Sequence, residues 1–259
     1  ILGTSYEPAT PEIATTNLTR QQATPEDTNP ELAPIQGATA SGKIAIILDD
    51  GGYGGEALES VLGLDPKITL AILPNTPFAL ETAQRGLASG FEIILHMPME
   101  THRTDLVPIQ GQLAENLTAT EIQERTIQAL NQIPGVLGAN NHEGSKFTSN
   151  RELMGVFLQV LEQKSLYFID SLTSPDSQGY EIAQALDIRT AERDIFLDNE
   201  RNESYIRGQF NALIQRAQQD GQAIGIGHFR LETARVLAEE IQNLTKLGLE
   251  LVHASELAQ

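Results

Sequence analysis

The sequence predicts an α/β fold, either a closed barrel or a doubly wound sheet, and two observations lead to it. Short apolar runs recur along residues 43–259, and longer segments in which apolar residues follow a helical period lie between them. Strand and helix alternate in this way some seven times, an order typical of a parallel sheet covered by helices. No internal repeat is visible, so we expect one folded domain over residues 43–259.

The predicted strands are continuous runs of aliphatic and β-branched residues with little polar alternation. Runs of this kind are typical of strands that are buried on both faces, as in a parallel sheet. In chain order they are Ile44–Leu48, Ile68–Leu73, Phe91–Leu95, Val136–Ala139, Leu166–Ile169, Ile195–Leu197, Ala223–Ile226 and Leu249–Val252.

The segments between these runs have the apolar period of a helix. The predicted helices are Glu56–Leu62, Pro77–Ala88, Thr120–Gln132, Arg151–Gln163, Ser177–Leu186, Glu203–Gln219 and Glu232–Leu247. Two of them have clear start signals. Thr118 lies three residues before Glu121, which is the spacing of a capping box, and Asn150 directly precedes the helix that begins at Arg151.

The first 42 residues differ in composition from the rest of the chain. They contain five of the twelve prolines, eight threonines and a single aromatic residue, Tyr6, with no apolar run long enough to bury a face. This composition predicts a disordered Pro/Thr-rich arm or linker over residues 1–42. The arm carries five acidic residues and one basic residue, so most of the formal charge of −18 belongs to residues 43–259.

Composition excludes several classes of function. The chain contains no cysteine, which excludes disulfide scaffolds, thiolate metal sites and cysteine nucleophiles. It has 35 acidic residues against 17 basic residues, whereas binding to nucleic acid or anionic lipid needs clustered Lys and Arg. We therefore expect no nucleic-acid partner, and a substrate that is neutral, cationic or held through a metal.

Two features lead to an expectation about localisation. No stretch approaches the roughly 18 to 20 apolar residues that a membrane span requires. The chain begins with Ile1 rather than Met, and a Pro/Thr-rich segment follows. We expect an exported protein, periplasmic or extracytoplasmic, from which a signal peptide or a membrane anchor has been removed. Any membrane tether would lie only in that removed segment.

Polar side chains follow most of the predicted strands. The loops after parallel strands converge on one edge of the sheet, where α/β folds bind their ligands. Three of the five histidines lie in such positions. The segments are Asp49-Asp50-Gly51-Gly52, His96-Met97-Pro98-Met99-Glu100, Asn140-Asn141-His142-Glu143-Gly144-Ser145, Asp170-Ser171, Asp198-Asn199 and Gly227-His228.

The pair Asp49-Asp50 is the strongest of these signals. Two adjacent carboxylates at the end of a buried strand repel each other and lose hydration, so they need a cation or hydrogen-bond donors nearby. The plainer interpretation is that one of them caps the turn formed with Gly51-Gly52. We expect at least one of the two carboxylates to act in a functional site.

His96 and Glu100 are four residues apart, and Pro98 lies between them. Because proline does not fit a regular central strand, we expect a turn that aims both side chains into one cavity. Histidine with a carboxylate is a common ligand set for zinc and related divalent ions. The alternative is a satisfied histidine at a strand end beside a surface glutamate.

The segment around His142 is richer in polar residues than a loop needs. An ordinary Asn/Gly turn accounts for Asn140 and Gly144 but not for His142, which we therefore expect to be functional. Asp170 and His228 fit an acid–base role, or a supporting role in which a carboxylate fixes the tautomer of an imidazole.

Taken together, these segments resemble the divergent polysaccharide deacetylases, a bacterial branch of the carbohydrate esterases. The likeness extends over residues 43–259 and rests on six motifs in order, ILDDGGYG, ILHMPME, GANNHEGS, FIDSLTS, RDIFLDN and IGIGH. It implies a NodB-like distorted (β/α) barrel of about seven parallel strands. It also implies a metal-dependent hydrolase that removes N- or O-acetyl groups from a polysaccharide or peptidoglycan-type glycan.

The resemblance assigns roles to individual residues. Asp49 would be the general base and His228 the general acid, while Asp170 and Asp198 would orient the histidines or bind substrate hydroxyls. The divalent metal, with zinc as the expected ion, would be held by Asp50, His96 and His142. Where the broader group has a second histidine this sequence has Glu100, so the third ligand is His142 or Glu100, and we prefer His142. The expected substrate-binding residues are Asn141, Ser145, Ser171 and Asp198.

Two other functions are compatible with the same residues. A non-catalytic envelope protein that binds metal and glycan on this fold is favoured by Glu100, which departs from the pattern of the broader group. A metal-dependent phosphoesterase would use the same Asp49-Asp50 pair.

Overall fold

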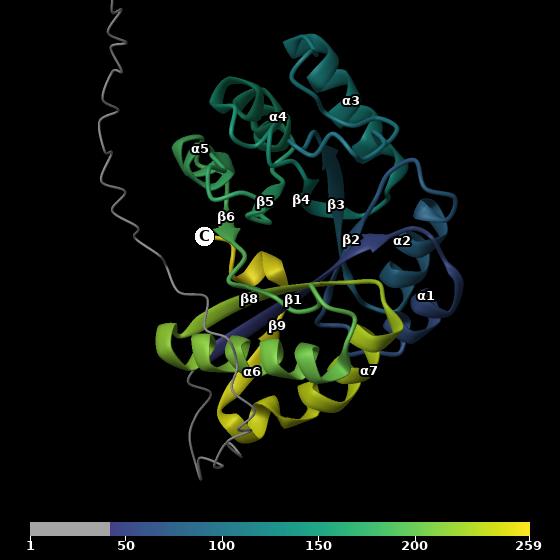
Figure 1. Cartoon of the computed structure of the whole chain (residues 1–259), viewed down its shortest axis with the longest axis vertical. Coiled ribbons are helices and arrows are strands. Elements are labelled where there is room, and N and C mark those ends of the chain that lie inside the picture. The colour runs from purple at the N-terminus through teal and green to yellow at the C-terminus, as the bar shows by residue number, and fades with distance from the viewer. Residues whose placement is uncertain (1–41) are drawn as a thin grey trace, which may run out of the picture. The chain divides into compact units, whose positions relative to one another are not determined.

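The computed structural model describes residues 42–259, in which nine strands form one curled parallel sheet with helices around it (Figure 1). The predicted arm of residues 1–42 lies outside the described residues except for Gly42, which begins the first strand. The strands are β1 Gly42–Gly51, β2 Thr69–Ile72, β3 Glu92–Met99, β4 Val136–Glu143, β5 Tyr167–Asp170, β6 Thr190–Glu192, β7 Ile195–Phe196, β8 Gln222–His228 and β9 Leu249–Val252.

The strand order is β6-β5-β4-β3-β2-β1-β8-β7, and β9 pairs with the start of β1. The two ends of this order are linked by Arg193 and Asp194, whose backbone amides donate to Asp170 O of β5 and Ile224 O of β8 at 3.0 and 2.9 Å. The predicted fold, a distorted barrel of parallel strands, is confirmed. All eight predicted apolar runs form strands, and the additional strand β6 has the sequence Thr-Ala-Glu, which contains no apolar run.

The helices agree closely with the predicted segments. They are α1 Gly55–Leu62, α2 Ala79–Ala88, α3 Ala119–Gln132, α4 Arg151–Gln163, α5 Gly179–Ala185, α6 Glu203–Asp220 and α7 Leu231–Glu240, which continues as a 3₁₀ helix over Ile241–Leu247. Thr118 and Glu121 form the predicted capping box of α3, and the Asn150 side chain accepts from the first amides of α4. None of the helices in residues 42–259 is long and apolar enough to cross a membrane.

Alternate residues of β1 face two different apolar clusters. Ile44, Ile46 and Leu48 belong to the larger cluster between the sheet and the helices, whereas Ala45 and Ile47 face the smaller cluster on the other side of the sheet. All five are fully buried. Burial on both faces explains why the strand is a continuous apolar run.

The amino end of the sheet is closed by the C-terminal segment 254–258. Ala254, Leu257 and Ala258 belong to the smaller apolar cluster, and Ser255 N donates to the buried Glu92 Oε1 at 3.2 Å. Glu92 Oε1 also accepts from Tyr167 Oη at 2.7 Å. Because this end is filled, the polar residues at the opposite, carboxyl ends of the strands are left to form the site.

Candidate active site

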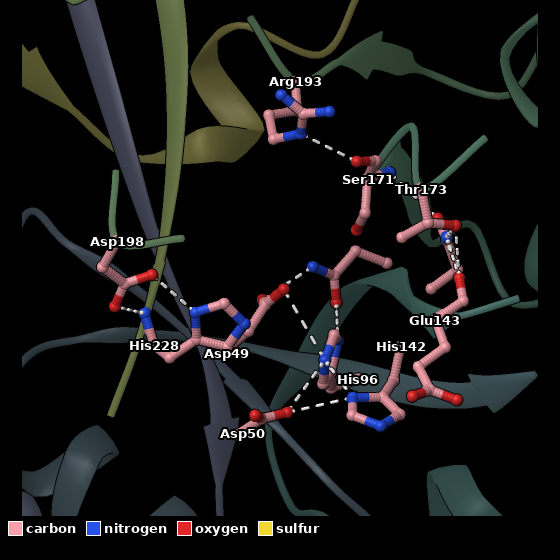
Figure 2. A network of polar contacts seen from close by, with 12 residues as sticks. Asp49, Asp50, His96, His142, Glu143, Ser171, Thr173, Arg193, Asp198 and His228 are labelled. Atoms are coloured by element: carbon pink, nitrogen blue, oxygen red, sulfur yellow. Dashed lines mark hydrogen bonds and ion pairs between the residues drawn. The ribbon is translucent and has the colours of Figure 1, made fainter. Parts of the chain in front are cut away.

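Side chains from several strands meet at the carboxyl edge of the sheet, as predicted (Figure 2). Asp49 of β1 is the register partner of His228 of β8, and His96 of β3 is the partner of Asn140 of β4. Figure 2 shows Asp49 between His228 and His96. The sheet register therefore brings together residues that are up to 179 positions apart in the sequence.

A local break in β1 turns both adjacent carboxylates toward the site. In a regular strand, Asp49 and Asp50 would point to opposite faces of the sheet. Here the register with β2 shifts between Leu48 and Gly51, and Asp50 has a φ of 65°, in the left-handed region. This conformation is unfavourable for a residue with a Cβ, and such strain is concentrated at functional sites.

Asp50, His96 and His142 form a cluster that fits a metal ion. The distances are 3.0 Å from Asp50 Oδ1 to His142 Nδ1, 3.4 Å from Asp50 Oδ1 to His96 Nε2, and 3.0 Å between the two imidazole nitrogens. Tetrahedral zinc with bonds of roughly 2.0–2.1 Å separates its ligand atoms by about 3.3 Å. The three atoms therefore already have nearly the spacing of zinc ligands.

The chemistry of these three atoms also fits a cation. Asp50 Oδ1 is buried and accepts no well-aligned hydrogen bond from residues 42–259. Burial would raise the pKa of Asp50, but interactions with His142 and His96 hold that pKa well below its usual range. An ionised oxygen facing two imidazole nitrogens is an N/O ligand set of the kind that zinc binds.

Glu100 lies outside this cluster, so the geometry favours His142 as the third ligand. Its carboxylate binds Lys146 Nζ at 2.9 Å and accepts from Glu115 N at 2.8 Å. The predicted turn at Pro98 is wrong, because β3 continues to Met99. Four residues of extended strand span roughly 13 Å, which places Glu100 too far from His96 to share an ion. Pro98 is tolerated because its backbone nitrogen, which has no hydrogen to donate, lies on the side of β3 that faces away from β4. On that side its carbonyl oxygen accepts from Leu113 N at 2.9 Å.

Asn140 is a functional residue that the sequence analysis missed. It is fully buried in β4, where its Nδ2 donates to Asp49 Oδ1 at 2.8 Å and its Oδ1 lies 2.7 Å from His96 Nδ1. The carboxylate of Asp49 accepts, so Asn140 must present its amide nitrogen to Asp49 and its oxygen to His96. His96 Nδ1 then carries the proton and Nε2 keeps the lone pair that a metal ligand needs.

The two adjacent carboxylates have different electrostatic environments. Burial raises the pKa of Asp49 and outweighs the nearby His96 and His228, which act in the opposite direction. The pKa of Asp50 is lowered instead. Neighbouring acids with pKa values shifted in opposite directions are typical of sites in which one group accepts a proton and the other stays ionised.

His228 is held by a second carboxylate, Asp198. His228 Nδ1 lies 2.7 Å from Asp198 Oδ1, while Asp198 Oδ2 accepts from His228 N at 2.9 Å and from Thr233 Oγ1 at 2.6 Å. Burial would lower the pKa of His228, but the Asp198 hydrogen bond raises it. Asp198 is fully buried, so of the two roles that the resemblance implies, its contacts favour orienting a histidine over binding a substrate hydroxyl.

An aromatic ring lies beside His228, and a cationic side chain lies over that aromatic ring. The ring of Phe196 is nearly parallel to that of His228, with centroids 6.3 Å apart, and the Arg193 guanidinium lies 3.8 Å from the Phe196 centroid. Arg193 also donates to the backbone oxygens of Ser171 and Leu172 at 2.8 and 3.0 Å. Arg193 thus connects Phe196 to the loop after β5.

The remaining predicted residues shape the loops around the site. Asp170 is fully buried, and its carboxylate accepts from Ser177, Tyr180 and Leu172 and contacts no histidine. Asn141, near the end of β4, holds the loop after β5 by accepting from Ser171 N at 2.9 Å.

Two hydroxyls that we expected to bind substrate have different surroundings. Ser145 Oγ bonds Thr101 Oγ1 at 2.9 Å and accepts from His102 N at 3.1 Å, so it anchors the loop after β3. Ser171 Oγ is buried and has no hydrogen-bond partner among residues 42–259.

Two cavities lie near this edge of the sheet. A cavity of about 550 Å³ borders Glu100, Glu143 and Lys146 and the loop after β3. A second cavity of about 250 Å³ borders Asp50 and His228. The smaller cavity therefore reaches the metal-ligand cluster through Asp50.

Known proteins resemble this chain in sequence. Residues 46–258 match the sequence profile described as divergent polysaccharide deacetylase. The chain is 37% identical over 227 residues to the uncharacterized protein YibQ of Escherichia coli K12, covering 87% of this chain and 70% of that protein. It is 34% identical over 219 residues to an uncharacterized protein of Haemophilus influenzae, covering 84% of this chain and 77% of that protein.

Solved structures share the fold. The uncharacterized protein ATU2773 of Agrobacterium tumefaciens C58 has a TM-score of 0.81 at 23% identity, covering 86% of this chain and 92% of the other. A mutant of BA3943, described as a CE4 family pseudoenzyme with restored enzymatic activity, has a TM-score of 0.52 at 17% identity, covering 88% and 72%. At these identities the likeness shows the fold alone.

Replacing His142 tests the identity of the third ligand. We expect the wild-type protein to bind about one zinc ion per chain. His142→Ala should lose most of this zinc, because a nitrogen ligand is removed. Glu100→Ala is the matched control and should keep its zinc. Metal content after gel filtration, measured by mass spectrometry, checks both variants, and loss of zinc from Glu100→Ala alone would reverse the assignment.

Replacing Asn140 tests its role behind the metal ligand. Asn140→Ala should weaken zinc affinity by roughly 10- to 100-fold, because His96 loses the partner that fixes its tautomer. The control is Asn141→Ala, which removes a neighbouring buried amide that does not contact His96. Competition with a chelating dye gives the affinities and thermal unfolding gives the stabilities. Equal loss of affinity in both variants would show that Asn140 acts only through stability.

Proposed function

The chain belongs to the divergent polysaccharide deacetylase family, and on that basis we propose that it hydrolyses N- or O-acetyl groups on a glycan with the help of a divalent metal. The observation that carries the proposal is the position of Asp49. This buried carboxylate lies 3.6 Å from His96 Nε2 at the metal-ligand cluster, and it is the register partner of His228. A proton acceptor thus stands next to both the ion site and a proton donor.

The residues divide the reaction between them. When bound, the cation would polarise the acetyl carbonyl and lower the pKa of the attacking water. Asp49 accepts a proton from that water as the water oxygen bonds the acetyl carbon. His228 then donates a proton to the sugar nitrogen or oxygen as its bond to the acetyl carbon breaks. Acetate and a free amine or hydroxyl result.

Supporting residues prepare both groups for these roles. Asn140 bonds Asp49 Oδ1, so the other carboxylate oxygen, Oδ2, remains available to accept the proton. Asp198 fixes the His228 tautomer by accepting from Nδ1, so that Nε2 is the nitrogen that faces the reaction. Both partners are buried, which keeps their hydrogen bonds from being exchanged with water.

We also propose zinc as the ion, an acetylated bacterial glycan as the substrate and the cell envelope as the location. The ligand set of one carboxylate and two imidazoles supports zinc. The family supports the glycan. Export rests on the composition of the first 42 residues alone.

Replacing Asp49 separates catalysis from binding. Asp49→Asn should lower acetate release from acetylated chito-oligosaccharide or peptidoglycan fragments by at least roughly 100-fold, because the amide accepts no proton, while zinc stays bound. Enzymatic acetate detection and metal analysis on the same sample give both readouts. If zinc-loaded wild-type protein binds glycan and releases no acetate, the chain is a non-catalytic glycan-binding protein on this fold.

Replacing Asp198 moves the pH profile in a defined direction. Asp198 raises the pKa of His228, so the donor stays protonated to a higher pH than an ordinary histidine. Asp198→Asn should therefore shift the alkaline limb of kcat/KM to lower pH, by roughly one unit. Asp170→Asn removes a buried carboxylate that contacts no histidine, so the alkaline limb of its kcat/KM profile should stay at the wild-type pH. If the alkaline limb is also unchanged in Asp198→Asn, His228 is not the proton donor.

A further inference from the structure

The cavity of about 250 Å³ beside His228 has basic side chains at its wall. It is lined by Asp50, Tyr53, Gly54, Arg201, His228 and Arg230, together with Ala57 and Phe229. We propose that this cavity binds a carboxylate carried by the acetylated glycan, so that the protein prefers acidic over neutral substrates. The inference rests on the proposed function, and it assigns the chemical class of the substrate.

Arg201 is the main reason for this inference. It is exposed, and within residues 42–259 no hydrogen bond, ion pair or ring contact involves its side chain. Every other arginine in this part of the chain has at least one such contact, as shown by the pairs of Arg85 with Glu59 and Arg207 with Glu240. An arginine without a partner is unexpected in a chain with 35 acidic residues against 17 basic ones.

Arg230 places a second guanidinium on the same wall. Its Nη1 donates to Asp198 O at 2.6 Å and lies 3.6 Å from Asp198 Oδ1, which fixes the group beside His228. Paired arginines are well suited to carboxylates because each offers several donors in one plane. The start of α1 at Gly54, which has no capping side chain, borders the same cavity and adds positive potential there.

Arg230 is paired with Asp198, whereas no acidic group among residues 42–259 pairs with Arg201. Asp50 is the one carboxylate among the lining residues, and its Oδ1 is directed to His142 Nδ1 at 3.0 Å. The cavity therefore combines two guanidinium groups with a carboxylate that belongs to the metal-ligand cluster. A ligand group of negative charge is favoured there by Coulomb attraction.

The size and position of the cavity restrict where the carboxylate lies on the substrate. A cavity of about 250 Å³ has room for an acidic substituent and too little for several sugars. It reaches His228, so the acidic group must be close to the acetyl group that reacts. Tyr53, which is 61% exposed, offers a ring for the adjoining sugar.

A pair of disaccharides tests the inference. N,N′-Diacetylchitobiose and N-acetylglucosaminyl-N-acetylmuramic acid share a β-1,4-linked backbone, and the second carries an added lactyl carboxylate. The amide of that carboxylate is the uncharged control. With zinc-loaded protein we expect calorimetry to show roughly 5- to 10-fold tighter binding of the acid than of the amide, the size of one partly solvated charged hydrogen bond. The preference should fall as salt rises.

Matched variants locate the effect. Arg201→Gln should bring the acid-to-amide ratio close to one. Arg235→Gln removes the same charge from an exposed arginine of α7 that lies outside the cavity lining, and it should keep the ratio. A ratio near one in the wild-type protein, or an equal loss in both variants, overturns the proposal. Competition by inorganic phosphate without any preference for the lactyl carboxylate also overturns it, and identifies a phosphate site instead.

The same measurements keep this inference separate from the proposed function. Acetate release from both disaccharides with no preference for the acid would leave the hydrolase assignment standing and remove the carboxylate site. Preferential binding of the acid that depends on Arg201, without acetate release from any substrate, would support the carboxylate site and remove the hydrolase assignment.

Discussion

Two adjacent carboxylates at the end of a fully buried strand are the constraint on which the rest of the site depends. Asp49 and Asp50 lose hydration together and repel each other, so each needs its own compensation. The left-handed conformation of Asp50 brings both toward one side of the sheet, where His96 and His142 surround Asp50. Asn140 donates to Asp49. One carboxylate is thereby suited to hold a cation and the other to accept a proton.

Two buried residues that do not face the cavities organise the site. Asn140 connects the acceptor Asp49 to the ligand His96 through one amide group, and Asp198 connects His228 to the loop after β7. Both residues are buried and hydrogen-bonded to their neighbours. Replacing either one therefore changes the tautomer and orientation of a histidine without removing a group that contacts the substrate. Arg230 connects the cavity beside His228 to Asp198, whereas the exposed Arg201 of the same cavity takes no part in these bonds.

Local signals predicted the fold well, whereas the site required information on register. Buried parallel strands are apolar runs, so all eight were visible, and the capping box at Thr118 gave the start of α3. From the sequence alone, an ordinary Asn/Gly turn is enough to account for Asn140, so this residue does not stand out. In fact β4 continues to Glu143, and the period of two places Asn140 and His142 on one face. That alternation was present in the sequence. The kink at Asp50 and the separation of Glu100 from the cluster depend on pairing between strands, which one sequence does not reveal.

The central claim is that Asp50, His96 and His142 hold one metal ion while Asp49 stays unligated beside it. A crystal structure of the zinc-loaded protein with anomalous data at the zinc edge tests it most directly. We predict one strong peak at roughly 2.0–2.2 Å from Asp50 Oδ1, His96 Nε2 and His142 Nδ1. A peak bonded to Asp49 or Glu100 in place of His142, or no peak at the cluster, would contradict the account.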